Sequence, residues 1–392
     1  MNILFHDYGG YAFSQQVARR LSQNHTITYL YSSDQLVKRC GDPASRTFAS
    51  KAVSTGRPLA KYNLVNRYLW EQSYGKTLAA HIRAERPHVV ISANTPLDSQ
   101  RILAQACRET RSRFIFWFQD AIGLAMENIL RHKIPVMGGL MGRYYQQMER
   151  RLLVQSDRVI LISPGFYPLL DDWGIERTKT HVIPNWAPLE EIPPMDQDNA
   201  WSRGHGLDKT VNFLYSGILG YKHNPEMFVT LAEHFKTDDR VRVVVVSEGG
   251  GADWLRGEQQ RRGLPNLILL PFQPADVYPQ VLASASVLVS LINADASRFS
   301  VPSKVLTYLC AGRPVLLSMS HQNEAAGMVE SAQAGLVSEP GDAAGWISQA
   351  ETLVNRPDLR ESLGRNARAY AEKHFALEPI YHQFEAILAE YE

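Results

Sequence analysis

Cysteines and long apolar runs are scarce in this sequence. Its 392 residues hold three cysteines, at positions 40, 107 and 310, and their odd number and wide spacing exclude a disulfide framework or a cysteine metal site. No apolar run approaches the ~18 residues of a membrane helix. The start, Met1-Asn-Ile-Leu-Phe-His-Asp7, turns polar too early for a signal peptide. These absences predict a cytoplasmic protein without a membrane span.

Several catalytic motifs are missing as well. The chain has no HExxH zinc motif, no GxSxG nucleophile elbow, no Walker loop and no GxGxxG dinucleotide fingerprint. His6, His132 and His223 do not stand at a metal-ligand spacing, and the acidic pair Asp171-Asp172 ends an expected helix. We therefore expect no metal and no cofactor, and we interpret these histidines as structural or solvated.

The net charge is only +1, but it is unevenly distributed. Residues 1–185 carry 24 Lys+Arg and 14 Asp+Glu, a net charge of +10, whereas the remaining residues carry 17 and 26, a net charge of −9. One interpretation is chance, with charges on solvated faces. The other is that the first half meets something anionic, such as a membrane surface.

The chain does have enough residues for two domains and a repeated alternation of short apolar strands with helices. Expected strands are 3–5, 26–31, 89–92, 114–118, 159–162, 181–183, 211–216, 241–247, 267–270, 287–290 and 315–318. Expected helices are 13–21, 97–110, 143–154, 225–235, 252–262, 277–283 and 304–311. This pattern predicts an α/β fold of two doubly wound, Rossmann-like domains with parallel sheets, whose ligand-binding turns follow the strands.

Proline and polar residues mark the expected boundary between these domains. We predict a first domain over 1–185, a connection over 186–208 and a second domain over 209–378. A last helix, 379–392, follows.

The segment from Phe299 to Val315 carries the clearest chemistry. A turn, Ser300 to Ser303, leads into an apolar helix that Gly312 closes. Free N–H groups at a helix start favour an anion. Lys304 in the first turn opposes the helix dipole but suits a bound phosphate.

Two turns of the first half are further candidates. Gly9-Gly10 follows the first strand, as a plain turn or as a loop that a phosphate or sugar approaches. Asp120 follows a very apolar strand, either as a helix cap or as a carboxylate that contacts sugar or acceptor hydroxyls.

Three turns of the second half match them. Ser216-Gly-Ile-Leu-Gly-Tyr-Lys222 places a lysine before a helix, and Glu248-Gly-Gly-Gly251 is a flexible turn or a close approach to a ligand. Phe272-Gln273 lies between prolines, as packing or as a contact to a flat base.

The order of these turns resembles that of the family 4 glycosyltransferases, which are retaining, metal-independent enzymes of the GT-B fold with two domains facing a central cleft. The resemblance is strongest to bacterial members that build exopolysaccharide, capsule or O-antigen repeats. It rests on Ser216-Gly-x-Leu-Gly-x-Lys222, Ser247-Glu-Gly-Gly-Gly251, Leu270-Pro-Phe-Gln-Pro274, and Val301-Pro-Ser-Lys304 with Gly312-Arg-Pro314.

The resemblance implies transfer of a sugar from a nucleotide donor, expected to be UDP-linked, with Asp120, Lys222 and Lys304 as catalytic residues. The donor-binding residues that it implies are Gly9, Gly10, Gly217, Lys222, Glu248, Gly249, Phe272, Gln273, Ser300, Val301, Pro302, Ser303, Lys304 and Thr307. Lys222 would neutralise the leaving diphosphate, and Phe272 and Gln273 would flank the base mainly through backbone groups.

The sequence departs from the family pattern at three positions. Phe299 and Thr307 stand where many members have glutamates that hold the sugar and the ribose, and Ile218 replaces a frequent arginine. These departures keep two alternatives open: a nucleotide-sugar epimerase of the same fold, and a binding subunit without catalysis.

On the acceptor side, two stretches of the basic half mix aromatic and cationic residues, 57–70 and 132–151. They are either basic helices packed on the domain or segments that lie on an anionic leaflet. The resemblance favours a polyprenyl-diphosphate-linked saccharide acceptor, attachment to the inner face of the cytoplasmic membrane, and no nucleic-acid partner.

Overall fold

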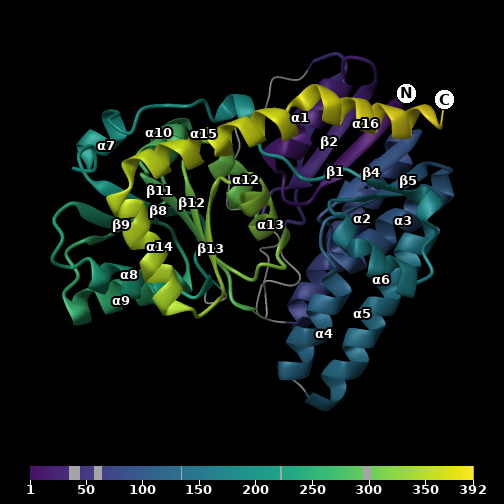
Figure 1. Cartoon of the computed structure of the whole chain (residues 1–392). Helices are drawn as coiled ribbons and strands as arrows, with labels where there is room; N and C mark the ends of the chain where they lie inside the picture. The colour runs from purple at the N-terminus through teal and green to yellow at the C-terminus, as the bar shows by residue number, and fades with distance from the viewer. Residues whose placement is uncertain (35–44, 57–63, 134, 221–222, 295–301, 392) are drawn as a thin grey trace. The chain divides into compact units, whose positions relative to one another are not determined.

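The chain divides into two compact units. The computed structural model describes residues 1–34, 45–56, 64–133, 135–220, 223–294 and 302–391. The first unit takes Met1–Asn185 and Leu377–Glu392, and the second takes Trp186–Ala376. Each unit has its own parallel sheet with helices packed on it (Figure 1). The two-domain Rossmann-like prediction is therefore confirmed.

Over its described residues, the first unit has a seven-stranded parallel sheet with the order β3-β2-β1-β4-β5-β6-β7. Its strands are β1 (Asn2–Asp7), β2 (Thr26–Ser32), β3 (Phe48–Val53), β4 (Val89–Ala93), β5 (Arg113–Phe118), β6 (Arg158–Leu161) and β7 (Thr180–Val182). All residues of the central strand β4 are buried, as expected for a parallel strand that helices cover on both faces.

The helices of this unit are α1 (Ala12–Leu21), α2 (Leu64–Glu85), α3 (Leu97–Thr110), α4 (Ile122–Lys133), α5 (Pro135–Gln155), α6 (Tyr167–Asp172) and α16 (Leu377–Ala389). Figure 1 shows α4 and α5 side by side. Two glycines permit this close packing: a Cβ at Gly123 would lie 2.8 Å from Gln146 Cα, and one at Gly142 would lie 2.6 Å from Glu127 Cα.

The last helix, α16, completes the core of the first unit. The ring of Phe384 packs edge-on against Trp117 of β5, with 5.2 Å between the centroids. Arg20 of α1 donates from Nε and Nη2 to the two carboxylate oxygens of Glu378, at 2.6 and 2.8 Å. Among the described residues, no helix combines the length and apolar character needed to cross a bilayer.

Over its described residues, the second unit has a six-stranded parallel sheet with the order β10-β9-β8-β11-β12-β13. Its strands are β8 (Val211–Ser216), β9 (Val241–Val246), β10 (Leu267–Leu270), β11 (Val287–Leu291), β12 (Val315–Ser318) and β13 (Gly335–Ser338). Its helices are α7 (Ala200–Gly204), α8 (Glu226–His234), α9 (Gly250–Arg262), α10 (Tyr278–Ala283), α12 (Ser303–Cys310), α13 (Glu324–Ser331), α14 (Ala343–Asn355) and α15 (Pro357–His374).

The segment 186–208, expected as a connection, packs as part of the second unit. It contains α7, whose capping residue Asn199 donates from Nδ2 to the Gln280 carbonyl at 3.1 Å. Trp201 is buried and its indole N–H donates to Gln273 Oε1 at 2.9 Å. This segment, rich in proline and polar residues, is therefore bound to the second unit by hydrogen bonds and by the buried Trp201 side chain.

Candidate functional site

Three of the predicted turns of the second unit follow strand ends that are in register. Ser216 at the end of β8 pairs with Val246 at the end of β9, and Val246 pairs with Leu270 at the end of β10. Gly217, Glu248 and Phe272 come directly or shortly after these residues. Parallel strands place their carboxyl ends at one edge of the sheet, so the fold brings these predicted residues to a common edge.

Helix α12 adds Lys304 to that edge. The helix begins at Ser303, and Pro302 precedes it without a side-chain cap. Lys304 Nζ donates to Tyr215 Oη at 2.7 Å and lies 4.3 Å from the centroid of the Tyr215 ring. Tyr215 Oη in turn donates to the Ile218 carbonyl at 2.8 Å. The lysine therefore reaches back from α12 to the turn that follows β8.

Gly217 leaves the space that Lys304 occupies. Its φ of +143° is one that side chains rarely adopt, and a Cβ there would lie 3.1 Å from Lys304 Cε. Burial raises the pKa of Tyr215, so its phenol stays protonated and can accept from the lysine while it donates to Ile218. A hydrogen bond to a charged group contributes about 1.5–3 kcal/mol, which exceeds the ~0.3–1 kcal/mol cost of a cation at a helix start.

Tyr308, one turn further along α12, fixes the helix against the same strand end. Its hydroxyl accepts the Ser216 N–H at 3.0 Å and donates to the Ser216 carbonyl at 3.2 Å. Tyr308 is fully buried, and burial raises its pKa. Residues four apart on a helix share one face, so Lys304 and Tyr308 together set the position of α12 on β8.

The glycine run after β9 has a structural cause at two positions. Gly249 has a φ of +105°, which strains any side chain. A Cβ at Gly251 would lie 2.6 Å from the Leu219 carbonyl oxygen, which accepts the Gly251 N–H at 2.9 Å. These glycines join the turn after β8 to the start of α9, while the neighbouring Glu248 is exposed.

Phe272 and Gln273 differ in what they offer a ligand. The Phe272 side chain is 37% exposed, so its ring is accessible. The Gln273 amide is already engaged, because Oε1 accepts from Trp201 and Nε2 donates to the Pro271 carbonyl at 2.9 Å. Backbone groups of this turn remain the better candidates for a base contact.

The other predicted donor-site residues fall into two groups. Lys222, Ser300 and Val301 lie outside the described residues. Pro302, Ser303 and Thr307 are described: Ser303 is exposed, and Pro302 and Thr307 are half-buried.

In the first unit, a buried carboxylate organises the Gly9-Gly10 loop. Asp7 ends β1 and is fully buried. Its Oδ1 accepts from Gly9 N at 3.2 Å and Asn94 Nδ2 at 2.9 Å, and its Oδ2 accepts from Tyr11 N at 2.9 Å and from the Ser14 hydroxyl. Burial raises the Asp7 pKa, and these hydrogen bonds oppose the rise.

This network bears on the predicted phosphate loop. Asp7 takes the N–H groups of Gly9 and Tyr11, and the Asp7 carbonyl takes that of Gly10 at 3.0 Å. Gly10 is left-handed, with a φ of +58°. The loop is thus a tight turn in which the N–H groups of Gly9, Gly10 and Tyr11 already bond to Asp7. A phosphate or sugar at this loop would have to contact groups other than these three N–H groups.

Asp120 follows β5 and is exposed, and its neighbour Glu149 is buried. Glu149 of α5 accepts the N–H groups of Ile122 at 3.0 Å and Gly123 at 2.8 Å, and so caps α4. Burial raises the Glu149 pKa to about 8; the two N–H groups oppose this rise, and the Asp120 charge adds to it. A carboxylate from another helix therefore serves the start of α4, which we considered as a role for Asp120.

Sequence reasoning missed Asp7, Glu149, Tyr215 and Tyr308. Asp7 lies in the turn expected after the strand 3–5, but the glycines of that turn carried the prediction. Tyr215 lies inside an expected strand and Tyr308 inside an expected apolar helix, so neither gave a turn signal. His6 is structural, as interpreted: it is buried and its ring nitrogens lie 3.1 Å from Ser92 Oγ and 3.0 Å from Tyr74 Oη.

Family models match both units. The glycosyl transferase 4-like domain model matches residues 11–186, and the glycosyl transferases group 1 model matches residues 197–370. WcaI of Escherichia coli, a glycosyl transferase assigned to colanic acid biosynthesis, is 24% identical over 251 residues, which are 63% of this chain. That match spans 60% of the relative's own length.

Solved structures share the fold over nearly the whole chain. Sucrose-phosphate synthase from Thermosynechococcus elongatus has a TM-score of 0.77 at 14% identity, covering 100% of this chain and 99% of its own. HepE from Anabaena in complex with UDP-glucose has a TM-score of 0.71 at 15% identity, covering 99% of both. With both domain models matched in order and the fold shared throughout, the chain belongs to the group 1, family 4 glycosyltransferases of the GT-B fold.

Proposed function

We propose that this glycosyltransferase moves a sugar from a UDP-linked donor to a polyprenyl-diphosphate-linked saccharide, with retention of anomeric configuration, in the synthesis of a cell-surface polysaccharide. The observation that carries the proposal is the position of Lys304, in the first turn of α12 and bonded to Tyr215 beside the turn after β8. The assignment of WcaI to colanic acid synthesis and the UDP-sugar complex of HepE support it.

The donor side follows from charge and geometry. Among the described residues, no side chain caps the start of α12, so its first N–H groups and the Lys304 ammonium suit a diphosphate. The exposed ring of Phe272, at the end of β10, suits stacking on a uracil base. Lys222 remains our prediction for a second cation, in a segment outside the described residues.

The proposed reaction breaks the bond between the anomeric carbon and the diphosphate oxygen. The acceptor hydroxyl forms the new bond on the same face, and its proton passes to the departing phosphate oxygen. Lys304, Lys222 and the α12 N–H groups would stabilise the charge that develops on the diphosphate. Asp120, exposed after β5, would position the acceptor hydroxyl. No metal is required in this scheme, because lysines carry the charge.

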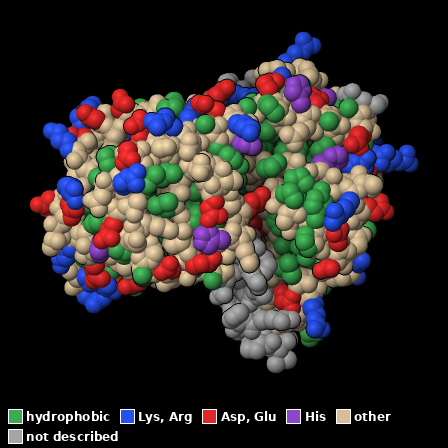
Figure 2. Space-filling view, in the orientation of Figure 1, with side chains coloured by type: hydrophobic (Ala, Val, Ile, Leu, Met, Phe, Trp, Pro, Cys, Tyr) green, Lys and Arg blue, Asp and Glu red, His purple; other side chains and the backbone are tan. Residues whose placement is uncertain are grey.

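For the acceptor, the first unit offers a basic and partly apolar surface. The first unit, residues 1–185 with 377–392, has 24 Lys+Arg and 18 Asp+Glu, a net charge of +6. Val65 and Leu69 of α2 are 68% and 51% exposed. Leu140 and Tyr144 of α5 are 67% and 56% exposed. Figure 2 shows hydrophobic side chains gathered on the face of the first unit where Figure 1 places α2. Such a surface suits peripheral attachment to an anionic leaflet at the inner face of the cytoplasmic membrane.

Turnover with a defined acceptor tests the proposal. UDP release from UDP-glucose and related donors is measured with and without a polyprenyl-diphosphate saccharide, and the product anomer is read by NMR. We expect release only with the acceptor, and the α-anomer from an α-linked donor. Isomerisation of the free donor, or an inverted product, would contradict the proposal.

Two sets of variants separate its parts. Asp120→Asn should lower kcat with little change in donor affinity, which thermal shift with UDP-sugar measures. Leu69→Ser with Leu140→Ser should weaken co-sedimentation with vesicles containing anionic lipid and leave turnover of a soluble short-chain acceptor unchanged. Equal vesicle binding by the double variant would rule out this surface as the attachment site.

A further inference from the structure

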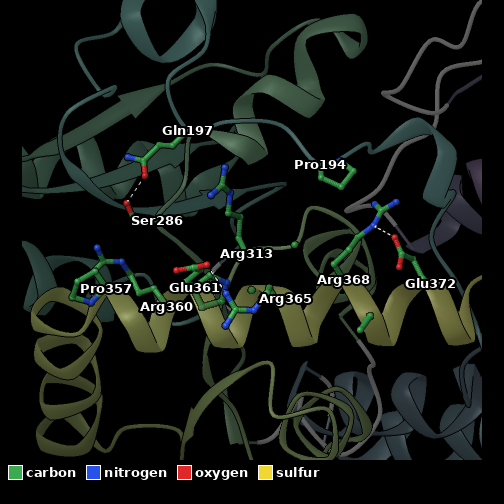
Figure 3. A pocket seen from close by; sticks show the side chains of 14 residues that line it. Pro194, Gln197, Ser286, Arg313, Pro357, Arg360, Glu361, Arg365, Arg368 and Glu372 are labelled. Atoms are coloured by element: carbon green, nitrogen blue, oxygen red, sulfur yellow. Dashed lines mark hydrogen bonds and ion pairs between the residues drawn. The ribbon is translucent and has the colours of Figure 1, made fainter.

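A pocket lies in the second unit, far along the strands from the predicted donor turns. It has a volume of about 480 Å³ and is lined by Ser286, which precedes β11, and by Pro314, which precedes β12 (Figure 3). The predicted donor turns follow the carboxyl ends of the strands in the same sheet. Because all strands of this sheet are parallel, the pocket lies at the opposite edge of the sheet from those turns.

Arginines dominate the charge of this pocket. Its lining contains four of them, Arg313, Arg360, Arg365 and Arg368, against two glutamates, so the formal charge is +2. Arg365 pairs with Glu361, and Arg368 Nε lies 2.7 Å from a Glu372 oxygen. Both glutamates are exposed, by 73% and 56%, so water or a competing anion can replace these pairs at little cost.

Arg313 and Arg360 have no carboxylate in ion-pair contact among the residues that the structure describes. Arg313 Nη2 donates to the Met195 carbonyl at 2.7 Å, and Arg360 Nη1 donates to the Val354 carbonyl at 3.0 Å. The Arg313 Nε–H is buried and has no hydrogen-bond partner within the described part of the chain. A buried donor of this kind is costly, and an acceptor bound in the pocket would satisfy it.

The backbone holds these side chains together. A Cβ on Gly364 of α15 would lie 2.6 Å from the Gly312 carbonyl oxygen, so α15 touches the turn that carries Arg313. Figure 3 shows Arg360, Arg365 and Arg368 in a row along α15, with Arg313 above that row on the side of Gln197 and Ser286. Arg368 Nη1 also donates to the Cys310 and Ile192 carbonyls, at 2.8 and 2.9 Å, which fixes the end of this row.

We propose that this pocket is a second anion site, which binds a phosphate-bearing compound through Arg313, Arg360 and Arg365. The planar guanidinium group presents paired N–H donors that match phosphate oxygens. The ligand is either a soluble phosphorylated compound or the headgroup of an anionic phospholipid, and both share this chemistry. The site is separate from the donor site, and the proposal does not depend on the transfer reaction.

Phosphate binding by the full chain tests the site. Inorganic phosphate and pyrophosphate are titrated by calorimetry at constant ionic strength, set with chloride. The Lys304→Ala background weakens the donor site, and the part of the remaining binding that the pocket arginine variants remove reports the pocket. In that background, Arg313→Gln with Arg360→Gln should weaken binding at least tenfold. Arg256→Gln, which removes an exposed arginine of α9 in the same unit, should leave it unchanged.

A further variant controls for misfolding, and a comparison of ligands identifies the source of the anion. Arg365→Gln removes a 65% exposed side chain, so it should fold normally and still weaken phosphate binding. Binding to phosphatidylglycerol vesicles that is lost in the double variant would identify a lipid headgroup, and binding of free phosphate alone would identify a soluble ligand. Equal phosphate affinity in all arginine variants, or no binding in the Lys304→Ala protein, would overturn the proposal.

Discussion

The ammonium of Lys304 lies 2.7 Å from the hydroxyl oxygen of Tyr215, and the Tyr215 hydroxyl donates its own hydrogen bond to the Ile218 carbonyl. This pair joins the first turn of α12 to the turn after β8. It turns a sequence motif into a defined position for a positive charge, because the tyrosine holds a flexible four-carbon side chain in one place.

Replacing the two members of this pair should affect turnover unequally. Lys304→Ala removes the charge itself and should lower kcat by about 10²–10³-fold, the usual loss for a group that stabilises developing negative charge. Tyr215→Phe keeps the Lys304 charge but removes the hydroxyl that holds the ammonium in place. It should lower kcat by roughly tenfold, equivalent to about 1.4 kcal/mol. Steady-state UDP release measures both. The control is Lys236→Ala, since that lysine of the same unit donates to the Arg262 carbonyl on the surface. A larger loss in the tyrosine variant than in the lysine variant would contradict this assignment.

The glycines of α9 should respond to alanine in opposite directions. Gly251→Ala places a Cβ 2.6 Å from the Leu219 backbone oxygen and should destabilise the second unit by about 1–3 kcal/mol. A Cβ at Gly257, in the same helix, would meet nothing within 4 Å, so Gly257→Ala should stabilise the unit by up to about 1 kcal/mol. Urea unfolding followed by circular dichroism compares the two. Stabilisation by Gly251→Ala would mean that the start of α9 does not lie in close contact with the Leu219 backbone in solution.

Buried His6 should make the first unit sensitive to acid. Burial lowers its pKa from 6.5 to about 3, so the folded state keeps the ring neutral. A depressed pKa gives stability that is present above pH 6.5 and is lost as the pH falls toward 3, by at most about 1.4 kcal/mol per pH unit. Between pH 7 and pH 5, wild type should therefore lose up to about 2 kcal/mol that His6→Gln does not lose. Urea unfolding of both proteins at several pH values gives the difference, and parallel curves would disprove the contribution.

Glu149 should change the stability with pH in the direction opposite to His6. Burial raises its pKa from 4.5 to about 8, so its contribution is complete below pH 4.5 and is lost as the pH rises through 8. Relative to Glu149→Gln, the wild type should become less stable with rising pH in this window, by at most about 1.4 kcal/mol per unit. Glu176→Gln, an exposed carboxylate of the same unit, is the control. A wild type that gains stability relative to Glu149→Gln from pH 5 to 8 would show that the two N–H groups outweigh burial.

Much of the fold could be predicted because apolar runs and turn residues are local signals. The strands 211–216, 267–270 and 315–318 and the helix 97–110 were predicted with the observed bounds. The edge strands β3 and β13 were missed. β3 has Lys51 and Ala52 exposed in its middle, so it does not form a continuous apolar run, and β13 has only two strongly apolar residues, Leu336 and Val337, between a glycine and a serine. Helix α2 was foreseen only in part, as one interpretation of the basic stretch 57–70. Its full length gave no clear helical pattern because its apolar residues lie on all sides: Trp70 and Tyr74 are buried, whereas Val65 and Leu69 are exposed.

The candidate site also contains residues that local signals predict and residues that they do not. The turn residues Gly217, Glu248 and Phe272 were predicted from their place after strands, and the register of β8, β9 and β10 brings those strand ends together. Tyr215 and Glu149 gave no local signal, because each acts on a segment distant in the chain. Arg313 belonged to a predicted motif, but its neighbours on α15 did not.

By itself, the sequence determined the alternation of strand and helix, the resulting two parallel sheets and the positions of the turns that we predict to carry the chemistry, because these depend on residues close together in the chain. The tertiary structure alone decided which side chains meet. In it, the N–H groups of the Gly9-Gly10 loop donate to Asp7, Lys304 donates to Tyr215, and Arg313 lies beside the arginines of α15. Such contacts depend on how strands and helices pack across a sheet, and spacing along the chain does not specify that packing.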